Sequence, residues 1–295
     1  MSFDRNYMGP FQLIRLIRSG TTTQVWEAKK KGERERVALK VLLRDYRDDK
    51  TEIEALKHEA KVGALLNHVN VIKIYGYHAD HLPLVSMQLF NARNLKIELR
   101  DNPEYVAFNM ETIIRLCAEG LKHMHDKGWV HCDVKPDNFL ADEQANVRLI
   151  DFSIAVATKK KGLAGLFGGN KSKTIRGTRS YMAPEQIRKQ NVDARTDVYG
   201  FGCVLYEMLS GKAPYSATNP DDLLHKHLRS PVPNMMAIAP VTKEFNSLCM
   251  RMIAKKMEDR PDSMAAVLQE LKRIRIYRAG GRKKYTEKQA ASEDE

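Results

Sequence analysis

The amino-acid sequence predicts an α+β protein with two lobes, of which the first is rich in strands and the second is mostly helical. Up to residue 89, short runs of valine and isoleucine alternate with turn-like or charged stretches, a pattern typical of strands. Beyond residue 90, apolar residues recur at helical spacing instead. We therefore expect a first lobe over residues 1–89, a second lobe over 90–278 and a flexible charged tail over 279–295.

The first lobe is expected to combine strands with a single helix. Its apolar runs predict strands over 11–17, 23–28, 36–43, 70–77 and 82–88. The helix is predicted over 51–66, where Thr51 stands three residues before Glu54 in a capping-box pattern. One face of this helix carries Leu56, Glu59, Gly63 and Leu66.

The second lobe is expected to be built from helices around one short hairpin. Helical spacing predicts helices over 110–128, 196–211, 243–256 and 262–274, and the nearly all-apolar segment 196–211 should be buried on most sides. The hairpin is expected over 139–150. A long connection from Asp151 to Glu185 contains a Gly- and Lys-rich insert at 159–173, which suits a solvated mobile loop and the docking of an acidic substrate or an anionic surface equally well.

The composition, with a net charge of +12, is that of a globular protein with a basic surface. Such a charge suits nucleic acid, anionic lipid or acidic proteins, but no basic stripe is interleaved with aromatic residues, so we do not expect nucleic-acid binding. No apolar run approaches the roughly 20 residues of a membrane helix. The N-terminus lacks the pattern of a secretory signal, and we expect a cytoplasmic location.

Neither the cysteines nor the histidines predict a metal site. The four cysteines stand far apart without a CxxC pair, so buried free thiols are expected. The histidines cluster in sequence, but a zinc site would need a further ligand. These histidines are His123, His125, His131, His225 and His227.

A dense polar cluster stands out in the stretch 130–140, written VHCDVKPDNFL. Asp133 and Asn138 precede the expected hairpin, and Asp151 follows it. Because a hairpin brings its two ends together, these three side chains are expected to converge. Two carboxylates and an amide, with Lys135 nearby, suit Mg²⁺ and phosphate.

The order of six short motifs resembles that of the eukaryotic-type Ser/Thr protein kinases, from about Phe11 to Ile276. The motifs are VALK at 37–40, HCDVKPDN at 131–138, DFS at 151–153, APE at 183–185, DVYGFG at 197–202 and DRP at 259–261. The resemblance implies the bilobal protein kinase fold. It also implies transfer of the ATP γ-phosphate to a serine or threonine hydroxyl of a protein substrate.

The resemblance assigns the chemistry to a few polar residues. Asp133 would accept the proton of the substrate hydroxyl as catalytic base, and Lys135 would neutralise charge on the transferred phosphoryl group. Asn138 and Asp151 would hold Mg²⁺. Lys40 would grip the α- and β-phosphates while paired with Glu59. The remaining nucleotide-binding residues would be Gly20, Val25, Ala38, Met87, Gln88, Leu89 and Leu140, with the hinge at 88–90.

Other matched residues are expected to support the site. Glu185 should pair with Arg260, and Asp197 should hydrogen-bond the backbone of the catalytic loop at 131–138. Thr178 resembles the threonine that bonds the catalytic aspartate and lysine in this family.

The chain departs from the family pattern in four places. The phosphate-covering loop, RSGTTTQV at 18–25, keeps only Gly20, which predicts reduced nucleotide affinity or turnover. Ser153 replaces a glycine and should make the 151–153 segment flip less readily. Gly63 stands where a larger apolar residue is usual, which predicts a loose contact with Phe152 and the need for an activating partner. Cys132 replaces an arginine, so we hypothesise that activation does not depend on a phosphate docking there.

Two alternatives remain open. The poor glycine loop favours a pseudokinase that serves as a nucleotide-binding or interaction scaffold, whereas the complete polar set around Asp133 opposes it. A small-molecule phosphotransferase would share the catalytic loop but would lack GTRSYMAPE at 177–185.

Overall fold

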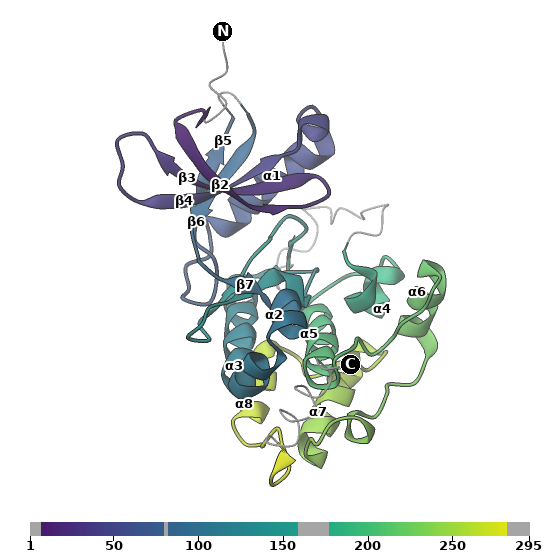
Figure 1. Ribbon diagram of the computed structural model, residues 1–295. Coiled ribbons are helices and arrows are strands. Elements are labelled where there is room, and N and C mark those ends of the chain that lie inside the picture. Colours follow the sequence, from purple (N-terminus) through teal and green to yellow (C-terminus); the bar gives the residue numbers. More distant parts are fainter. Residues whose placement is uncertain (1–6, 80–81, 159–176, 282–295) are drawn as a thin grey trace. The chain divides into compact units, whose positions relative to one another are not determined.

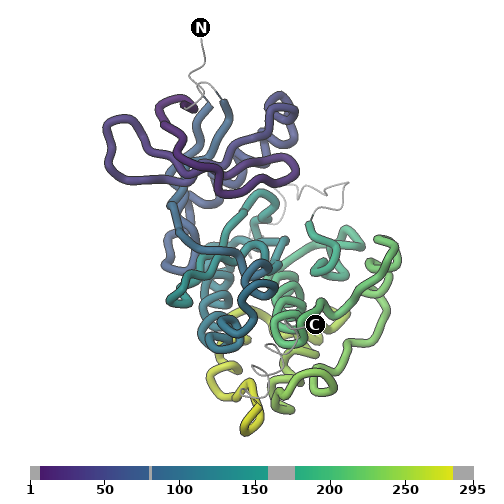
Figure 2. Tube along the Cα trace, viewed as in Figure 1, coloured from purple at the N-terminus to yellow at the C-terminus, as the bar shows by residue number. Residues whose placement is uncertain are grey.

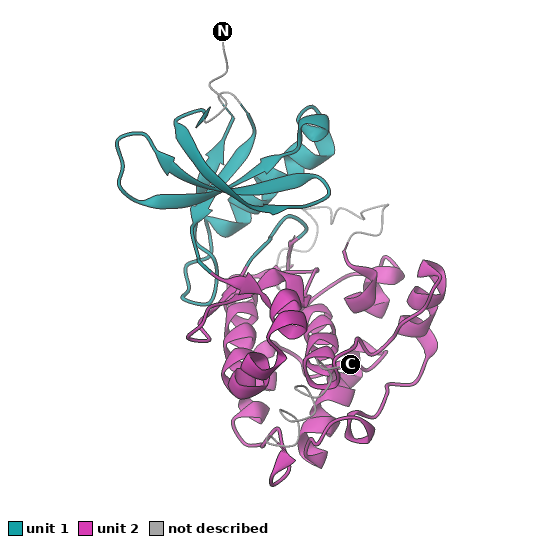
Figure 3. Ribbon diagram, viewed as in Figure 1, with its two compact units in different colours: residues 1–91, 150–154 teal, residues 92–149, 155–295 magenta. Residues whose placement is uncertain are grey.

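The computed structural model describes residues 7–79, 82–158 and 177–281, which form two units (Figure 3). Unit 1 contains Met1–Asn91 and Ile150–Ile154, and unit 2 contains Ala92–Leu149 and Ala155–Glu295. Strands dominate unit 1 and helices dominate unit 2, which confirms the predicted α+β class. The predicted insert at 159–173 and most of the predicted tail lie outside the described residues.

Unit 1 is built on an antiparallel six-stranded sheet in the order β1-β2-β3-β4-β6-β5 (Figure 1). Its strands are β1 (Tyr7–Met8), β2 (Phe11–Ser19), β3 (Thr23–Lys30), β4 (Arg36–Leu42), β5 (Ile74–His78) and β6 (Leu84–Gln88). Side chains alternate across a strand, so Leu39 and Val41 of β4 face a core that includes Phe11. Ala38 and Lys40 take the opposite face of the same strand, and this alternation decides which side of the sheet carries the Lys40 amine.

Helix α1 (Lys50–Gly63) has Asp49 as its N-cap, two residues before the Thr51 cap that the capping box predicted. The side chain of Asp49 accepts hydrogen bonds from the backbone N–H groups of Thr51, at 2.7 Å, and Glu52, at 3.3 Å. Thr51 is therefore inside the helix and is not its cap, because Asp49, two residues earlier, already accepts N–H groups of the first helical turn. Leu56, Glu59 and Gly63 are buried on one face, as expected.

The helices of unit 2 surround one central buried helix. Every residue of α5 (Ala194–Ser210) from Thr196 to Leu209 is buried, which confirms the prediction for this apolar segment. Its left-handed C-cap, Gly211, has φ 76°, a conformation that glycine adopts without strain. The other helices are α2 (Leu95–Asp101), α3 (Pro103–Asp126), α4 (Pro184–Ile187), α6 (Pro220–Arg229), α7 (Lys243–Met252) and α8 (Met264–Leu271).

Several helix boundaries in unit 2 differ from the expected ones. Helix α3 starts at Pro103, because a proline at the first helical position costs no hydrogen bond. Helices α2, α4 and α6 were not predicted. Along the chain trace, α8 packs against α3 (Figure 2).

None of the helices among the described residues is both long enough and apolar enough to cross a bilayer.

Two small sheets lie beside the helices of unit 2. The expected hairpin is present as β9 (Phe139–Ala141) paired with β10 (Val147–Leu149), and β7 (Arg93–Asn94) adds a third strand. A second pair joins β8 (Trp129–Val130) to β11 (Val156–Ala157). These pairings fix both ends of the catalytic loop, which runs from β8 to β9.

His227 of α6 lies fully buried in unit 2 beside two tyrosines. Its Nδ1 lies 2.8 Å from the hydroxyl of Tyr199 on α5, and the Tyr215 ring meets it edge-on at 5.0 Å. Burial, together with the nearby Lys255 cation, lowers the pKa of His227 to about 4. The ring is therefore neutral at pH 7, and it joins α6 to α5 as a hydrogen-bonding partner and not as a charge.

This buried histidine predicts a pH dependence of stability. In the unfolded chain a histidine titrates near pH 6.5, so between about pH 6.5 and 4 the unfolded state binds more protons than the folded state. The free energy of unfolding should fall by up to about 3 kcal/mol as the pH drops through this window. Urea denaturation of the parent and of His227→Gln, between pH 7.5 and 4.5, should show this component only in the parent.

The control is His225→Gln, which changes an exposed histidine of the same helix. It should retain the pH dependence of the parent. Identical pH profiles for the parent and His227→Gln would contradict the assignment.

Candidate active site

Unit 1 contributes a buried ion pair with a shared cation. The Lys40 Nζ lies 2.6 Å from the Glu59 carboxylate and 3.3 Å from the Asp151 carboxylate. Strand β4 supplies the lysine, the buried face of α1 supplies the glutamate, and the segment Ile150–Ile154 supplies the aspartate. The pairing of Lys40 with Glu59 that the motifs imply is confirmed.

Burial and the opposite charge of the partner act in opposite directions on the pKa values of Lys40 and Glu59. Burial opposes the charge of Lys40, but Asp151 and Glu59 outweigh it and raise the pKa of the amine above its usual value. Burial, reinforced by the charge of Asp151, raises the pKa of Glu59 to about 7 against the opposing effect of Lys40. One cation between two carboxylates leaves an excess of negative charge, and this donor set fits a hard divalent cation at Asp151.

The backbone of Asp151 is held in an uncommon conformation. Its φ is 68°, in the left-handed region that residues other than glycine seldom adopt. The Ser153 hydroxyl donates to Asp151 Oδ1 at 2.7 Å, and the Ser153 N–H approaches the same atom at 3.3 Å. Ser153 therefore stabilises the orientation of the aspartate.

The expected gap beside Gly63 is absent, so the prediction of a loose contact is wrong. A Cβ placed on Gly63 would lie 2.2 Å from Ile74 Cγ1, 2.9 Å from Ile74 Cβ and 3.4 Å from a ring carbon of Phe152. Ile74 at the start of β5 thus fills the space that a larger residue on α1 would take. Ile74 and Phe152 thus both lie against α1 at Gly63, within unit 1, and the need for an activating partner stays a prediction.

This packing makes Gly63 sensitive to the smallest substitution. Gly63→Ala should lower the free energy of unfolding by about 1–3 kcal/mol, because the clash reaches Ile74 Cβ and a rotamer change cannot relieve it. Urea denaturation of Gly63→Ala, Ile74→Ala and the double variant measures the coupling between the two positions. The double variant should be more stable than the sum of the single losses by at least about 0.5 kcal/mol. Strict additivity would show that the two residues do not compete for one space.

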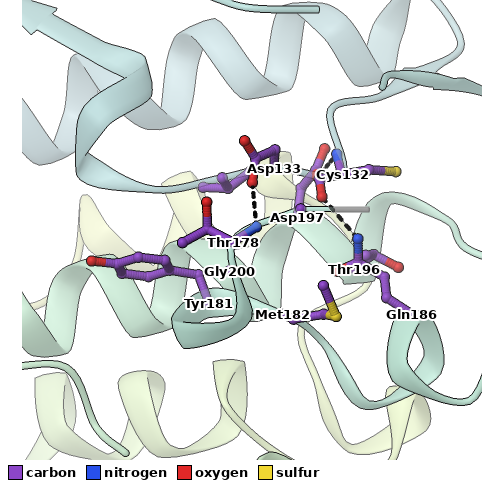
Figure 4. A pocket seen from close by; sticks show the side chains of 11 residues that line it. Cys132, Asp133, Thr178, Tyr181, Met182, Gln186, Thr196, Asp197 and Gly200 are labelled. Carbon is purple, nitrogen blue, oxygen red and sulfur yellow. Dashed lines mark hydrogen bonds between the residues drawn. The ribbon is translucent and has the colours of Figure 1, made fainter. Parts of the chain in front are cut away.

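Unit 2 contributes Asp133 with an ordered set of donors, of which Figure 4 shows Thr178. The Lys135 Nζ donates to Asp133 Oδ2 at 2.6 Å and to the Thr178 hydroxyl at 2.8 Å. The Thr178 N–H donates to Asp133 Oδ1 at 2.9 Å, which confirms that Thr178 bonds both residues. The Asn138 amide donates to the Asp133 backbone oxygen at 2.8 Å. Asp133 is therefore fixed through both its side chain and its main chain.

The backbone before Asp133 rests on Asp197, a buried carboxylate of α5. Asp197 Oδ2 accepts the His131 N–H at 2.7 Å, and Oδ1 accepts the Cys132 N–H at 2.9 Å. His125 Nε2 lies 2.9 Å from Oδ2. The expected hydrogen bonds from the catalytic loop to Asp197 are thus confirmed. They hold Cys132 at φ 66°, a left-handed conformation.

A second buried carboxylate fixes the end of the segment that carries Thr178. Glu185 forms a two-pronged ion pair with Arg260, at 2.8 and 2.9 Å, and accepts the Thr196 hydroxyl at 2.8 Å. This confirms the predicted pair. Such a bidentate pair is geometrically specific, so it fixes α4 against Arg260, while the Thr196 hydroxyl joins α4 to α5.

The thiol of Cys132 is protected. Burial, reinforced by the negative charges of Asp197, Asp133 and Glu185, raises its pKa well above the usual value. The thiolate is the reactive form, so this environment disfavours redox chemistry and supports a packing role. Cys117, Cys203 and Cys249 are buried free thiols as well, as expected.

A small pocket opens beside Asp133, entirely within unit 2 (Figure 4). Gly177, with φ 110°, lets the chain turn so that Thr178 reaches Asp133, and a side chain there would be strained. The pocket is lined by Cys132, Asp133, Val134, Gly177, Thr178, Tyr181, Met182, Gln186, Thr196, Asp197 and Gly200.

The remaining predicted nucleotide-binding residues divide between the units. In unit 1, Val25 pairs with Lys40 and Ala38 with Met87 across the sheet, Gln88 ends β6, and Leu89 follows it. The Gly20 N–H donates to the Thr23 carbonyl at 2.8 Å, which closes the turn between β2 and β3. Leu140 lies on β9 of unit 2. A nucleotide pocket shared by these residues, and the convergence of Asp151 with Asp133 and Asn138, stay predictions.

Two contacts were not anticipated from the sequence. Ile74 was expected only as one apolar residue of a strand. Gln186, directly after the APE motif, donates through its amide to the Cys132 carbonyl at 2.8 Å. Neither contact has a spacing signal, because each depends on how distant segments pack.

Comparisons with known proteins agree with the motifs. A family model described as "Protein kinase domain" matches residues 11–271. The serine/threonine-protein kinase PknH of Mycobacterium bovis is 34% identical over 254 residues, which cover 85% of this chain and 42% of that protein. The serine/threonine-protein kinase PknB of Mycolicibacterium smegmatis is 31% identical over 271 residues, covering 90% and 43%. The chain therefore spans about two fifths of the length of these curated relatives.

Proposed function

The chain belongs to the protein kinase domain family, and on that premise we propose that it transfers the γ-phosphate of ATP to serine or threonine hydroxyls of a protein substrate. The observation that carries the proposal is the arrangement at Asp133, whose carboxylate is oriented by Lys135 and Thr178 at the edge of a pocket. The similar serine/threonine-protein kinases support the choice of acceptor.

Each residue has a physical task under this proposal. Asp133 accepts the proton of the incoming hydroxyl, and the Thr178 N–H keeps one carboxylate oxygen in place while it does so. Lys135 offsets negative charge near the transferred phosphoryl group. Because Thr178 also binds Lys135, the base and the cation keep a fixed separation.

The nucleotide and metal are assigned to residues of both units. Lys40, held by Glu59, binds the α- and β-phosphates, and Asn138 and Asp151 hold Mg²⁺. When bound, Mg²⁺ neutralises charge on the phosphate oxygens. The carboxylate of Asp151 is a ligand that Mg²⁺ prefers, and the Ser153 hydroxyl keeps it oriented. Adenine is assigned to Val25, Ala38, Met87, Gln88, Leu89 and Leu140, with Gly20 near the phosphates, and a cytoplasmic location stays a prediction.

A phosphate-transfer assay tests the proposal. With labelled ATP and Mg²⁺, the parent should label itself or a general protein acceptor. Asp133→Asn should reduce this transfer on the order of 10²–10⁴-fold, because the amide cannot accept the proton. Thermal unfolding and ATP binding, measured alongside, should change little.

The alternatives give different results in the same assay. ATP binding without transfer by the folded parent would indicate a pseudokinase scaffold. Transfer to a sugar or another small molecule but never to protein would indicate a small-molecule phosphotransferase. Equal transfer by the parent and Asp133→Asn would contradict the role of Asp133.

A further inference from the structure

The peptide that joins Cys132 to Asp133 is held by side chains on both of its polar groups. The Asp133 N–H donates to His131 Nδ1 at 3.2 Å, and the Cys132 carbonyl accepts from the Gln186 amide at 2.8 Å. Cys132 itself has φ 66°. A residue in this conformation keeps it only where its surroundings fix it, so these two bonds, together with those to Asp197, fix the orientation of Asp133.

Gln186 is itself firmly placed. Its Oε1 accepts the Ala183 N–H at 3.1 Å while its Nε2 donates to the Cys132 carbonyl. It directly follows Glu185, whose carboxylate is bound by Arg260. A primary amide serves both bonds at neutral pH, because one end accepts from an N–H and the other donates to a C=O.

The segment 178–186 therefore holds Asp133 at two points, its side chain and the peptide that precedes it. The Thr178 N–H binds the Asp133 side chain, and Gln186 binds the peptide that precedes Asp133. Figure 4 shows Gln186, Cys132, Asp133 and Thr178 around one pocket. When this segment is folded as described, both contacts form together, and neither involves a positive charge or a phosphate.

We propose that Gln186 is a positioning residue for phosphoryl transfer: its amide fixes the Cys132–Asp133 peptide and thereby the aim of the Asp133 carboxylate. This rests on the proposed function of Asp133. Gln186 also gives the chain a neutral link between the Thr178 segment and the catalytic loop. This link suits a loop in which Cys132 stands where an arginine would bind a phosphate.

Steady-state kinetics of the full chain test the proposal. Gln186→Glu places a carboxylate oxygen against the Cys132 carbonyl in a side chain of equal size. We expect kcat to fall at least about tenfold while KM for ATP stays within about twofold, because the ATP-binding lysine lies in unit 1. Gln190→Glu makes the same charge change at an exposed glutamine of the same segment and should leave both constants unchanged.

The pH profile separates positioning from general damage. A carboxyl group that takes up a proton regains a donor for the Cys132 carbonyl. The ratio of kcat for Gln186→Glu to kcat for the parent should therefore rise as the pH falls from 8 to 5.5. An unchanged kcat, a ratio independent of pH, or an equal loss in Gln190→Glu would overturn the proposal.

A second measurement does not depend on turnover. Hydrogen exchange of the 131–134 backbone, followed by mass spectrometry, should be at least about tenfold faster in Gln186→Leu than in the parent or Gln190→Leu. Equal exchange would overturn the positioning role even if kinase activity were absent. Slow exchange in the parent without any phosphate transfer would instead contradict only the proposed function.

Discussion

The carboxylate of Asp197 accepts the backbone N–H groups of His131 and Cys132, and the rest of the catalytic loop is arranged around these two bonds. The carboxylate is effective because α5, which carries it, is buried along nearly its whole length and cannot shift without disturbing the core of unit 2. From this anchor the chain passes through the strained Cys132 to Asp133, where Thr178 and Lys135 complete the arrangement. The chemistry proposed for Asp133 thus depends on a helix that contributes no reacting atom.

In unit 1, a buried charge is stabilised by an ion pair. Lys40 must remain charged although it is buried, and it does so because Glu59 and Asp151 share it. The position of Glu59 depends on α1, and α1 depends on Ile74, which fills the space above Gly63. A substitution of one methyl group at Gly63 therefore reaches the ion pair through packing alone. The departures from the family pattern at Gly63 and Ser153 are compensated inside unit 1, by Ile74 and by a serine hydroxyl.

The sequence predicted the contacts that follow from fixed motifs, and it failed where tertiary packing or local competition decides. The pairs Glu185–Arg260 and Lys40–Glu59 were predictable because both partners stand in ordered motifs. The cap of α1 was assigned to Thr51 because the pattern there is good, but Asp49, two residues earlier, accepts the N–H groups of Thr51 and Glu52, so the helix has already begun at Thr51. Helix α6 escaped prediction because most of its residues are polar, and its buried His227 is explained by its contacts with Tyr199 and Tyr215. Ile74 and Gln186 act across segments that no spacing connects.

The most direct test of the account is the kinetics and ATP affinity of Asp197→Asn. The two loop N–H groups bond different oxygens of Asp197, and in asparagine an NH2 group, which only donates, replaces one of these oxygens, so the catalytic loop should lose its fixed geometry while the helix keeps its packing. The account predicts that kcat falls on the order of 10²-fold and that the Kd for ATP, measured by calorimetry, stays within about threefold of the parent value. A kcat close to that of the parent in a folded Asp197→Asn protein would contradict the claim that this carboxylate organises the site.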